Sequence, residues 1–284
     1  MALRQYRGRL APSPTGLLHL GHAATFWQAF IRARDHDGTL LLRIEDLDKQ
    51  RSKSQFTEAI LEDLTWLGIS WQPPALYQSQ RLPFYREALD RLLITGQIYP
   101  CHCSRKDLAA MMHAPHEDTD DEPVYPGTCR PARNAHQHEA LFQPNINYRF
   151  RIPDGAVLNF EDKNLGPQSF TASKDFGDFL IWRKDAVPSY QLACVVDDAN
   201  TNITEVVRGR DLLKSTARQI LLQRALMLPT PAYFHTPLLI DEHGVRLAKR
   251  HDALSIRALR QQSFTPAQVL QMAAIHMTTV TSNR

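Results

Sequence analysis

Residues 9–22 of the chain read Arg9-Leu-Ala-Pro-Ser-Pro-Thr-Gly-Leu-Leu-His19-Leu-Gly-His22. The residues around this stretch predict a β-strand over 6–12, a turn over 13–16 and a strongly apolar helix over about 20–33. A strand that turns directly into a helix presents free backbone N–H groups and the positive end of the helix dipole. The stretch therefore predicts a phosphate-binding turn in an α/β fold.

Three residues of this turn suit a nucleotide. Gly21 lets a flat base approach the backbone, and His19 and His22 can donate hydrogen bonds to phosphate oxygens as charge develops on them. A His-x-Gly-His tetrapeptide alone is not specific, because a histidine at a helix start is more often a cap or a satisfied core residue. Both interpretations stay open on these residues alone.

Outward from the turn, strands alternate with helices through the first hundred residues. A strand is predicted over 39–45. The predicted helix that follows begins at a capping box of Ser52 and Gln55, and one face of it carries Phe56, Ile60, Leu64 and Leu67. A further predicted helix over 82–92 ends at Gly96, before a short strand at 98–99. This alternation predicts one half of a doubly wound sheet.

After Pro100 the pattern changes. Cysteines, an acidic run at 117–122 and a strand over 148–152 with alternating apolar and charged residues predict an antiparallel insertion. The α/β pattern resumes with predicted strands over 190–197, 203–207 and 233–240 and a helix over 215–226. Two short helices follow, the second with Thr265 as its cap and Pro266 at its first position.

A second cluster of candidate site residues, Arg246-Leu-Ala-Lys249-Arg250, follows the last predicted strand. A flexible lysine can follow a migrating phosphate charge, and an arginine can hold phosphate through a fork of N–H groups. Three cations in five residues are usually solvated. Here both clusters would fall at the same end of a split sheet, where nucleotides bind.

The four cysteines do not form a disulfide framework. Cys194 lies in an apolar run and is predicted to be core, whereas Cys101, Cys103 and Cys129 lie within 29 residues and favour a structural zinc ion over three unrelated buried thiols. The chemistry leaves the fourth ligand open among nearby groups, which include His102, His113 and His116.

Composition sets broad limits. With 284 residues and 43% hydrophobic content, the chain can bury one core or one core with an inserted subdomain. It has no secretory leader pattern and no apolar run of about 18 residues, so we expect a cytoplasmic protein without a membrane partner. The net charge is +3, but from Arg208 onward 11 Lys and Arg face 4 Asp and Glu, which indicates either a polyanionic partner or a solvated basic helical face.

The order of these motifs resembles one known family. Residues 11–22 resemble the HIGH signature of class I aminoacyl-tRNA synthetases, and residues 246–250 are similar to their KMSKS signature. Residues 42–46 and 195–198 complete a pattern that resembles glutamyl-tRNA synthetases from Arg9 to about Ala253.

The resemblance implies a reaction and its residues. ATP with Mg²⁺ would activate L-glutamate, with His19, His22 and Lys249 stabilising the transition state and Gly21, His22 and Lys249 binding ATP. The glutamate pocket would be Arg9, Ser13, Glu45, Tyr190 and Arg208, with Arg9 or Arg208 on the side-chain carboxylate and Glu45 on the α-ammonium. Glutamate presents two anionic groups and one cationic group, which need charge-assisted partners when buried. Apart from the resemblance, ordinary sheet packing for Tyr190 and a surface ion pair for Glu45 would be the favoured interpretations.

One group within the family is the best match. The segment Tyr125-Pro-Gly-Thr-Cys129-Arg130 is similar to one in glutamyl-queuosine tRNA(Asp) synthetases, which implies a zinc ion on Cys101, Cys103, Tyr125 and Cys129. Only about 30 residues follow the KMSKS-like segment, so we expect no anticodon-binding domain, as in that group. Ala248 and Arg246 stand where KMSKS has its first serine and first lysine, and His22 stands where this group has serine.

The expected fold is a class I synthetase Rossmann-like doubly wound parallel sheet, split by a zinc-bearing α+β insertion. The expected divisions are 1–99 and 188–252 for the two halves of the catalytic domain, 100–187 for the insertion and 253–284 for a short helical end. The expected function is ATP-dependent transfer of glutamate by a monomer to the queuosine base in the anticodon arm of tRNA(Asp). The alternatives are a truncated glutamyl-tRNA synthetase that charges a tRNA 3′ end, a catalytically silent RNA-binding paralogue, and a zinc-stabilised module that makes adenylates for another acceptor.

Overall fold

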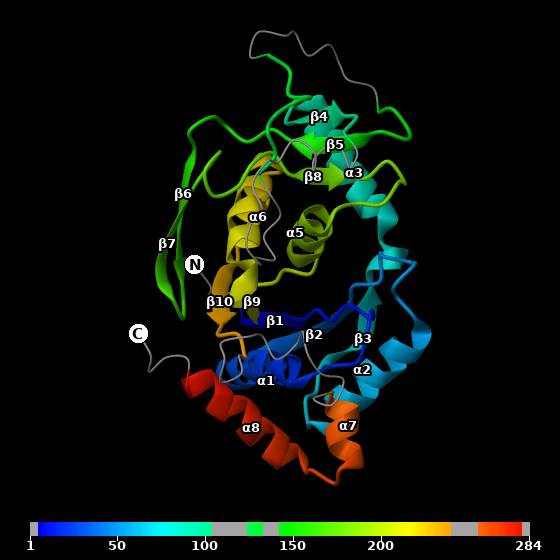
Figure 1. The fold of residues 1–284 in the computed structure, drawn as a ribbon, viewed down its shortest axis with the longest axis vertical. Helices are drawn as coiled ribbons and strands as arrows, with labels where there is room; N and C mark the ends of the chain where they lie inside the picture. The colour runs from blue at the N-terminus through cyan, green and yellow to red at the C-terminus, as the bar shows by residue number, and fades with distance from the viewer. Residues whose placement is uncertain (1–4, 104–123, 133–141, 240–254, 280–284) are drawn as a thin grey trace.

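The computed structural model describes residues 5–103, 124–132, 142–239 and 255–279, and side chains as far as 274. The elements, labelled as in Figure 1, are β1 (Arg7–Leu10), α1 (Leu20–Asp35), β2 (Thr39–Ile44), α2 (Ser54–Trp66), β3 (Gln72–Tyr77), η1 (Gln78–Gln80), α3 (Leu82–Ile94), β4 (Ile98–Cys101), β5 (Asn147–Phe150), β6 (Val157–Asp162), β7 (Gly166–Thr171), β8 (Leu180–Trp182), α5 (Tyr190–Asn200), β9 (Glu205–Gly209), η2 (Arg210–Leu212), α6 (Leu213–Ala225), β10 (Ala232–Thr236), α7 (Ile256–Gln261) and α8 (Pro266–Thr279).

The parallel strands form two sheets that meet between β1 and β9. One sheet has the order β1-β2-β3, all parallel, and the other has the order β7-β6-β10-β9, in which β10 is parallel to both β6 and β9. The two sheets meet where the Thr204 N–H, just before β9, donates to the Arg7 carbonyl at 2.9 Å. The strand order therefore reverses at β1 and β9, which is the position where open α/β sheets bind ligands.

Helices cover both faces of these sheets. Along β2, Leu40 and Leu42 pack into a core shared with α1, α2, α7 and α8, whereas Leu41 packs into a second core with α3, α5 and α6. Val206 and Val207 of β9 divide between the two cores in the same way. A strand that buries both faces explains the nearly continuous apolar sequence of β2 and confirms the predicted α/β layering. In the described residues, no helix is both long and apolar enough to cross a membrane.

Most of the predicted elements are confirmed, including the helix end at Gly96, whose φ of 64° suits glycine. Two predictions are wrong. The strand predicted over 190–197 is helix α5, capped by the Ser189 hydroxyl, which accepts a hydrogen bond from the Leu192 N–H. Helix α2 begins at Ser54, with Lys53 at its N-cap and no side-chain cap, so the capping box predicted at Ser52 does not form.

The antiparallel insertion is present as the sheet β4-β5-β8, at the end of the molecule opposite α7 and α8 (Figure 1). The hairpin β6–β7, which no sequence pattern predicted, lies within the same stretch of chain but pairs through β6 with β10. The segment expected to be an insertion therefore also extends the sheet that carries β9.

Candidate active site

A cavity of about 530 Å³ lies at the reversal point of the strand order. It is bounded by the carboxyl ends of β1 and β9, the start of α1, the start of α5 and the segment after β10. Every predicted residue of the nucleotide and glutamate sites that the structure describes lines it: Arg9, Ser13, His19, Gly21, His22, Glu45, Tyr190 and Arg208. Lys249 lies outside the described residues.

His19 and His22 close the N-terminus of α1 as a reciprocal cap. The Gly21 N–H donates to His19 Nδ1 at 3.1 Å, and the His19 N–H donates to His22 Nδ1 at 3.2 Å. The two rings lie 3.7 Å apart between centroids. A Cβ at position 21 would lie 3.0 Å from the His19 ring, so glycine leaves the space that this cap requires.

This arrangement fixes the protonation of both rings. Because each Nδ1 accepts a hydrogen bond, each neutral ring carries its proton on Nε2. Burial lowers the pKa of His19, and burial together with His19 lowers the pKa of His22 to about 3. The cap interpretation is therefore confirmed, and it leaves the Nε2–H group of each ring to serve as the donor that the other interpretation predicts.

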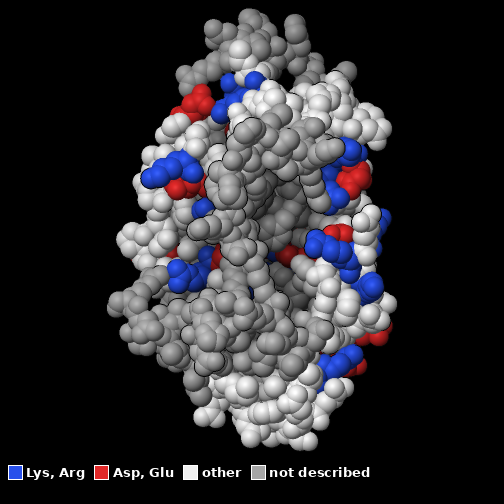
Figure 2. All heavy atoms as spheres, viewed as in Figure 1, with Lys and Arg blue, Asp and Glu red and all other residues white. Residues whose placement is uncertain are grey.

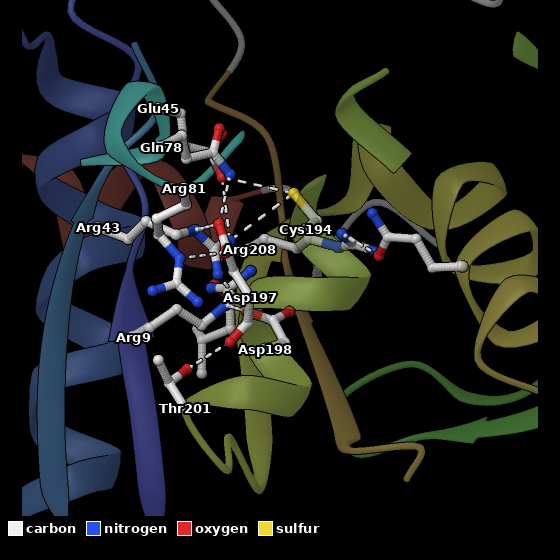
Figure 3. A network of polar contacts seen from close by, with 12 residues as sticks. Arg9, Arg43, Glu45, Gln78, Arg81, Cys194, Asp197, Asp198, Thr201 and Arg208 are labelled. Atoms are coloured by element: carbon white, nitrogen blue, oxygen red, sulfur yellow. Dashed lines mark hydrogen bonds and ion pairs between the residues drawn. The ribbon is translucent and has the colours of Figure 1, made fainter. Parts of the chain in front are cut away.

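A buried network of arginines and carboxylates lies behind the cavity wall, where Arg9 and Glu45 line the cavity. Figure 3 shows Arg9 and Arg43, from β1 and β2, directed toward the acidic pair of α5. Asp198 Oδ1 lies 2.5 Å from Arg43 and 3.5 Å from Arg9, and the second terminal nitrogen of Arg43 lies 3.0 Å from Glu45 Oε1. Each charge in this trio of contacts is therefore paired, which offsets the cost of its burial.

Asp197 and Cys194 add further hydrogen bonds to this network. Asp197 accepts hydrogen bonds from Arg81 at 2.6 Å, Tyr85 at 2.8 Å and Gln78 at 2.9 Å. Burial and then the Glu45 carboxylate raise the pKa of Cys194, so its thiol stays protonated and donates to Glu45 Oε1 at 3.4 Å. Glu45 Oε1 is therefore held by both Arg43 and Cys194.

Arg208 has a different environment, although it is 5% exposed. Its guanidinium donates to three neutral groups: His235 Nε2 at 3.3 Å, Gln219 Oε1 at 2.9 Å and Thr216 Oγ1 at 2.6 Å. In the described part of the chain, no carboxylate forms an ion pair with it. A buried guanidinium with only neutral partners is costly unless an anion completes the site, and the cavity that it lines provides the place for one.

The three cysteines predicted to bind metal lie together beside the antiparallel sheet. The sulfur atoms of Cys101, Cys103 and Cys129 lie within 4.8 Å of one another, and all three thiols are free. The Tyr125 hydroxyl lies 3.5 Å from Cys101 Sγ and 3.6 Å from Cys103 Sγ. Around a tetrahedral zinc ion with usual bond lengths, a ligand oxygen and a ligand sulfur would lie about 3.5 Å apart, so the four groups fit such a centre.

Of the three histidines named as candidates for the fourth metal ligand, the structure describes only His102. The side chain of His102 is exposed and does not join the cluster, whereas His113 and His116 lie outside the described residues. Arg149 contacts the cluster from the core side, donating to Cys101 Sγ at 3.3 Å with its guanidinium 3.9 Å from the Tyr125 ring centre.

Sequence reasoning missed several residues of the site. Arg43 and Asp198 occur in the sequence only as members of longer motifs, and no sequence pattern singles out His235, Thr216 or Gln219. A signal existed for Arg43, because it is the one charged residue in the apolar strand Thr39–Ile44. Thr216 and Gln219 lie three residues apart on α6, so the helix brings these two together, but no local pattern connects them with Arg208 of β9 or His235 of β10.

Comparison with known proteins places this geometry in a family. A family model described as the catalytic domain of class I tRNA synthetases for E and Q matches residues 5–284. Relatives named glutamyl-Q tRNA(Asp) synthetase are 46% identical in Symbiobacterium thermophilum, where the match covers 93% of this chain and 84% of the relative, and 43% identical in Burkholderia cenocepacia, where it covers 96% and 88%.

Solved structures give the same result for the fold. A glutamate tRNA ligase from Elizabethkingia meningosepticum, solved in complex with its amino acid, matches with a TM-score of 0.72 and 27% identity over 92% of this chain. A glutamate–tRNA synthetase from Elizabethkingia anophelis matches with a TM-score of 0.73 and 27% identity over the same share. The present chain spans about half the length of these two proteins, 54% in each.

Proposed function

The chain belongs to the class I tRNA synthetases of the glutamate and glutamine group, and from this membership we propose that it activates L-glutamate with ATP and transfers it to the queuosine base in the anticodon of tRNA(Asp). The observation that carries the choice of amino acid is the buried Arg208, which has only neutral partners among the described residues and lines the cavity. The choice of acceptor rests on the names of the relatives.

Glutamate binding would use the charges already in place. Arg208 would hold the side-chain carboxylate, with Arg9, Ser13 and Tyr190 around the remaining polar groups. Glu45 would accept the α-ammonium, because its carboxylate is fixed at the cavity edge by Arg43. Each charged group of the ligand would then meet a charged or polar partner that the fold has already oriented.

In the first step, an α-carboxylate oxygen of glutamate attacks the α-phosphorus of ATP. The bond from that phosphorus to the bridging oxygen breaks, and pyrophosphate leaves with its Mg²⁺. The Nε2–H groups of His19 and His22 would donate to phosphate oxygens as their charge increases, and because both rings are neutral they do so without a change of protonation. Glutamyl-adenylate is the product.

Lys249 would add a positive charge to the same phosphates. The described residues on both sides of its segment support this role, because Leu239 lines the cavity and Ser255 forms a β-bridge with His19. In the second step, a hydroxyl of the queuosine ring attacks the glutamyl carbonyl carbon, an ester forms and AMP leaves.

The RNA would be held by phosphate contacts and by the metal-binding end of the molecule. Figure 2 shows Lys and Arg side chains along both edges of one face, each group accompanied by acidic residues. A zinc ion on Cys101, Cys103, Tyr125 and Cys129 would fix the small antiparallel sheet without taking part in the reaction.

The test is transfer of labelled glutamate, with ATP, to tRNA(Asp) that contains or lacks queuosine, with tRNA(Glu) as a parallel acceptor. Labelling only of queuosine-containing tRNA(Asp) is expected. Labelling of tRNA(Glu) would instead identify a minimal synthetase that charges the 3′ end, and no labelling of any RNA would contradict the transfer step.

A further inference from the structure

A buried chain of hydrogen bonds links Arg208 to the hairpin β6–β7. His235 of β10 lies between Arg208 and Asp162 of β6, with its Nε2 3.3 Å from Arg208 Nε and its Nδ1 2.5 Å from Asp162 Oδ2. His235 is 0% exposed and Asp162 is 1% exposed. Neither residue lines the cavity, so their effect on a ligand must pass through Arg208.

Asp162 is held in the ionised form. Although burial raises its pKa, hydrogen bonds from His235 and from the N–H groups of Leu165 and Asn164 lower it below the ordinary value. Those backbone groups donate to Oδ1, which leaves Oδ2 to accept from His235. The carboxylate can therefore act only as an acceptor toward the imidazole.

This acceptor sets the tautomer of His235. The ring must place a proton on Nδ1 to donate to Asp162. The lone pair of its Nε2 then accepts the Arg208 Nε–H at 3.3 Å and also faces the Thr216 hydroxyl at 3.0 Å. Burial lowers the pKa of His235, and the charge of Arg208 lowers it further against the opposing effect of Asp162. The ring is thus a neutral spacer between a carboxylate and a guanidinium.

The neutral His235 ring leaves the positive charge of Arg208 available for a ligand. A carboxylate in direct contact would neutralise the guanidinium, whereas a neutral acceptor orients it and leaves its charge for a ligand. With Nε on His235 and one N–H of each terminal nitrogen on Gln219 and Thr216, each terminal nitrogen keeps one further N–H. These are the groups that could bind a carboxylate as a fork.

We infer that Asp162 and His235 are positioning residues that orient Arg208 toward the cavity, and that they make the pocket select a side-chain carboxylate over the corresponding amide. The inference deepens the proposed function and rests on it for the identity of the ligand. Selection follows because a glutamine side chain would place an NH₂ donor against the N–H groups of Arg208, whereas both oxygens of a carboxylate accept.

Asp162→Asn is the informative perturbation. With Oδ1 retained by its backbone donors, the new amide NH₂ faces His235 and forces the proton of the ring onto Nε2. There the proton meets the Arg208 Nε–H donor to donor and competes with Arg208 for the Thr216 oxygen, so both contacts of Arg208 are disturbed. His235→Gln is its counterpart, because a glutamine oxygen can replace Nε2 as the acceptor. Glu161→Gln is the matched control, since it removes the same charge from an exposed position of β6.

The experiment measures KM for glutamate and for ATP in the transfer assay, and binding of glutamate and glutamine by calorimetry. In Asp162→Asn we expect a rise of about ten- to a hundredfold in the glutamate KM, little change in the ATP KM and weaker preference for glutamate over glutamine. His235→Gln should keep most of the preference, and Asp162→Asn should cost much less in that background, because the tautomer is no longer involved. Unchanged glutamate KM and preference in Asp162→Asn would overturn the inference.

Nitrogen-15 NMR of the histidine rings separates this inference from the proposed function. We expect an Nδ1–H tautomer for His235, identified by its loss in His235→Gln, and an Nε2–H tautomer in Asp162→Asn together with a shifted Arg208 Nε–H signal. An Nε2–H tautomer in the wild-type protein would refute the positioning role whatever the activity. The expected tautomers in a protein that does not bind glutamate would refute the proposed function and leave the positioning of Arg208 in place.

Discussion

Arg43 and Arg208 allow a matched test of which charge serves the fold and which serves the ligand. Both side chains are buried, at 1% and 5% exposed, and glutamine can replace either one. Arg43 contacts Glu45 at 3.0 Å and Asp198 at 2.5 Å, whereas Arg208 contacts only neutral groups in the described residues. The same chemical change should therefore have two different effects.

The magnitudes follow from these partners. Arg43→Gln leaves two buried carboxylates without their main partner, so the free energy of unfolding should fall by about 3–5 kcal/mol. Arg208→Gln loses hydrogen bonds worth about 1 kcal/mol each but also removes a buried charge without an anionic partner, so the net change should be no more than about 1 kcal/mol in either direction.

Equilibrium unfolding in urea, with and without glutamate, measures both effects. At a glutamate concentration of about 100 times Kd, the wild-type protein should gain about 2.7 kcal/mol, and Arg208→Gln should gain almost nothing. A loss of stability in Arg208→Gln as large as that in Arg43→Gln would refute the reasoning, because Arg208 would then be part of the scaffold. Full stabilisation of Arg208→Gln by glutamate would refute its role toward the ligand.

Three further predictions concern other parts of the chain. The pKa of His22 falls from 6.5 to about 3 on folding, so the unfolded chain binds a proton that the folded chain does not. The free energy of unfolding should therefore fall as pH drops from about 6.5 toward 3, by about 1–2 kcal/mol at pH 5. Urea titrations at pH 7 and pH 5 should show a smaller fall for His22→Gln than for the wild-type protein. Gly21→Ala would press on the His19 ring, 3.0 Å from the new Cβ, and should raise the KM for ATP about tenfold with little effect on that for glutamate, as steady-state kinetics would show. Arg149→Met removes the hydrogen bond to Cys101 Sγ and should lower zinc affinity about 10–100-fold in a chelator competition, and equal affinity would contradict a supporting role.

The sequence was most informative where the structure is local. The strand, turn and helix around residues 9–22 involve neighbours in the chain, and apolar spacing with turn residues predicts them. Helix α5 was mistaken for a strand because its residues 191–198 are all buried, and a helix that is buried on every side has the same continuous apolar sequence as a central strand.

Contacts between residues far apart in the sequence limited how much of the site could be predicted. Arg9, Glu45 and Arg208 were predicted through a family resemblance and the charges of the ligand, and the structure brings them to one cavity. The pair Arg43 and Asp198 is separated by 155 positions in the chain, so no local pattern connects its members. Whether a cation in an apolar strand has a buried carboxylate partner depends on how α5 packs against β2, and the sequence alone does not show this packing.

The pairing of β6 with β10 bears on how this enzyme can be recombined with its relatives. An exchange of the whole stretch from β4 to β8 would import a foreign β6 beside a native β10, and with it a foreign residue beneath His235. The stretch between β4 and β5 shares no such strand with the catalytic half in the described structure, and it carries Tyr125 and Cys129. Chimeras that take β4, with its Cys101, together with the stretch that carries Tyr125 and Cys129 should therefore keep the cysteine cluster within one parent, whereas any wider exchange must transfer β6 and β10 together.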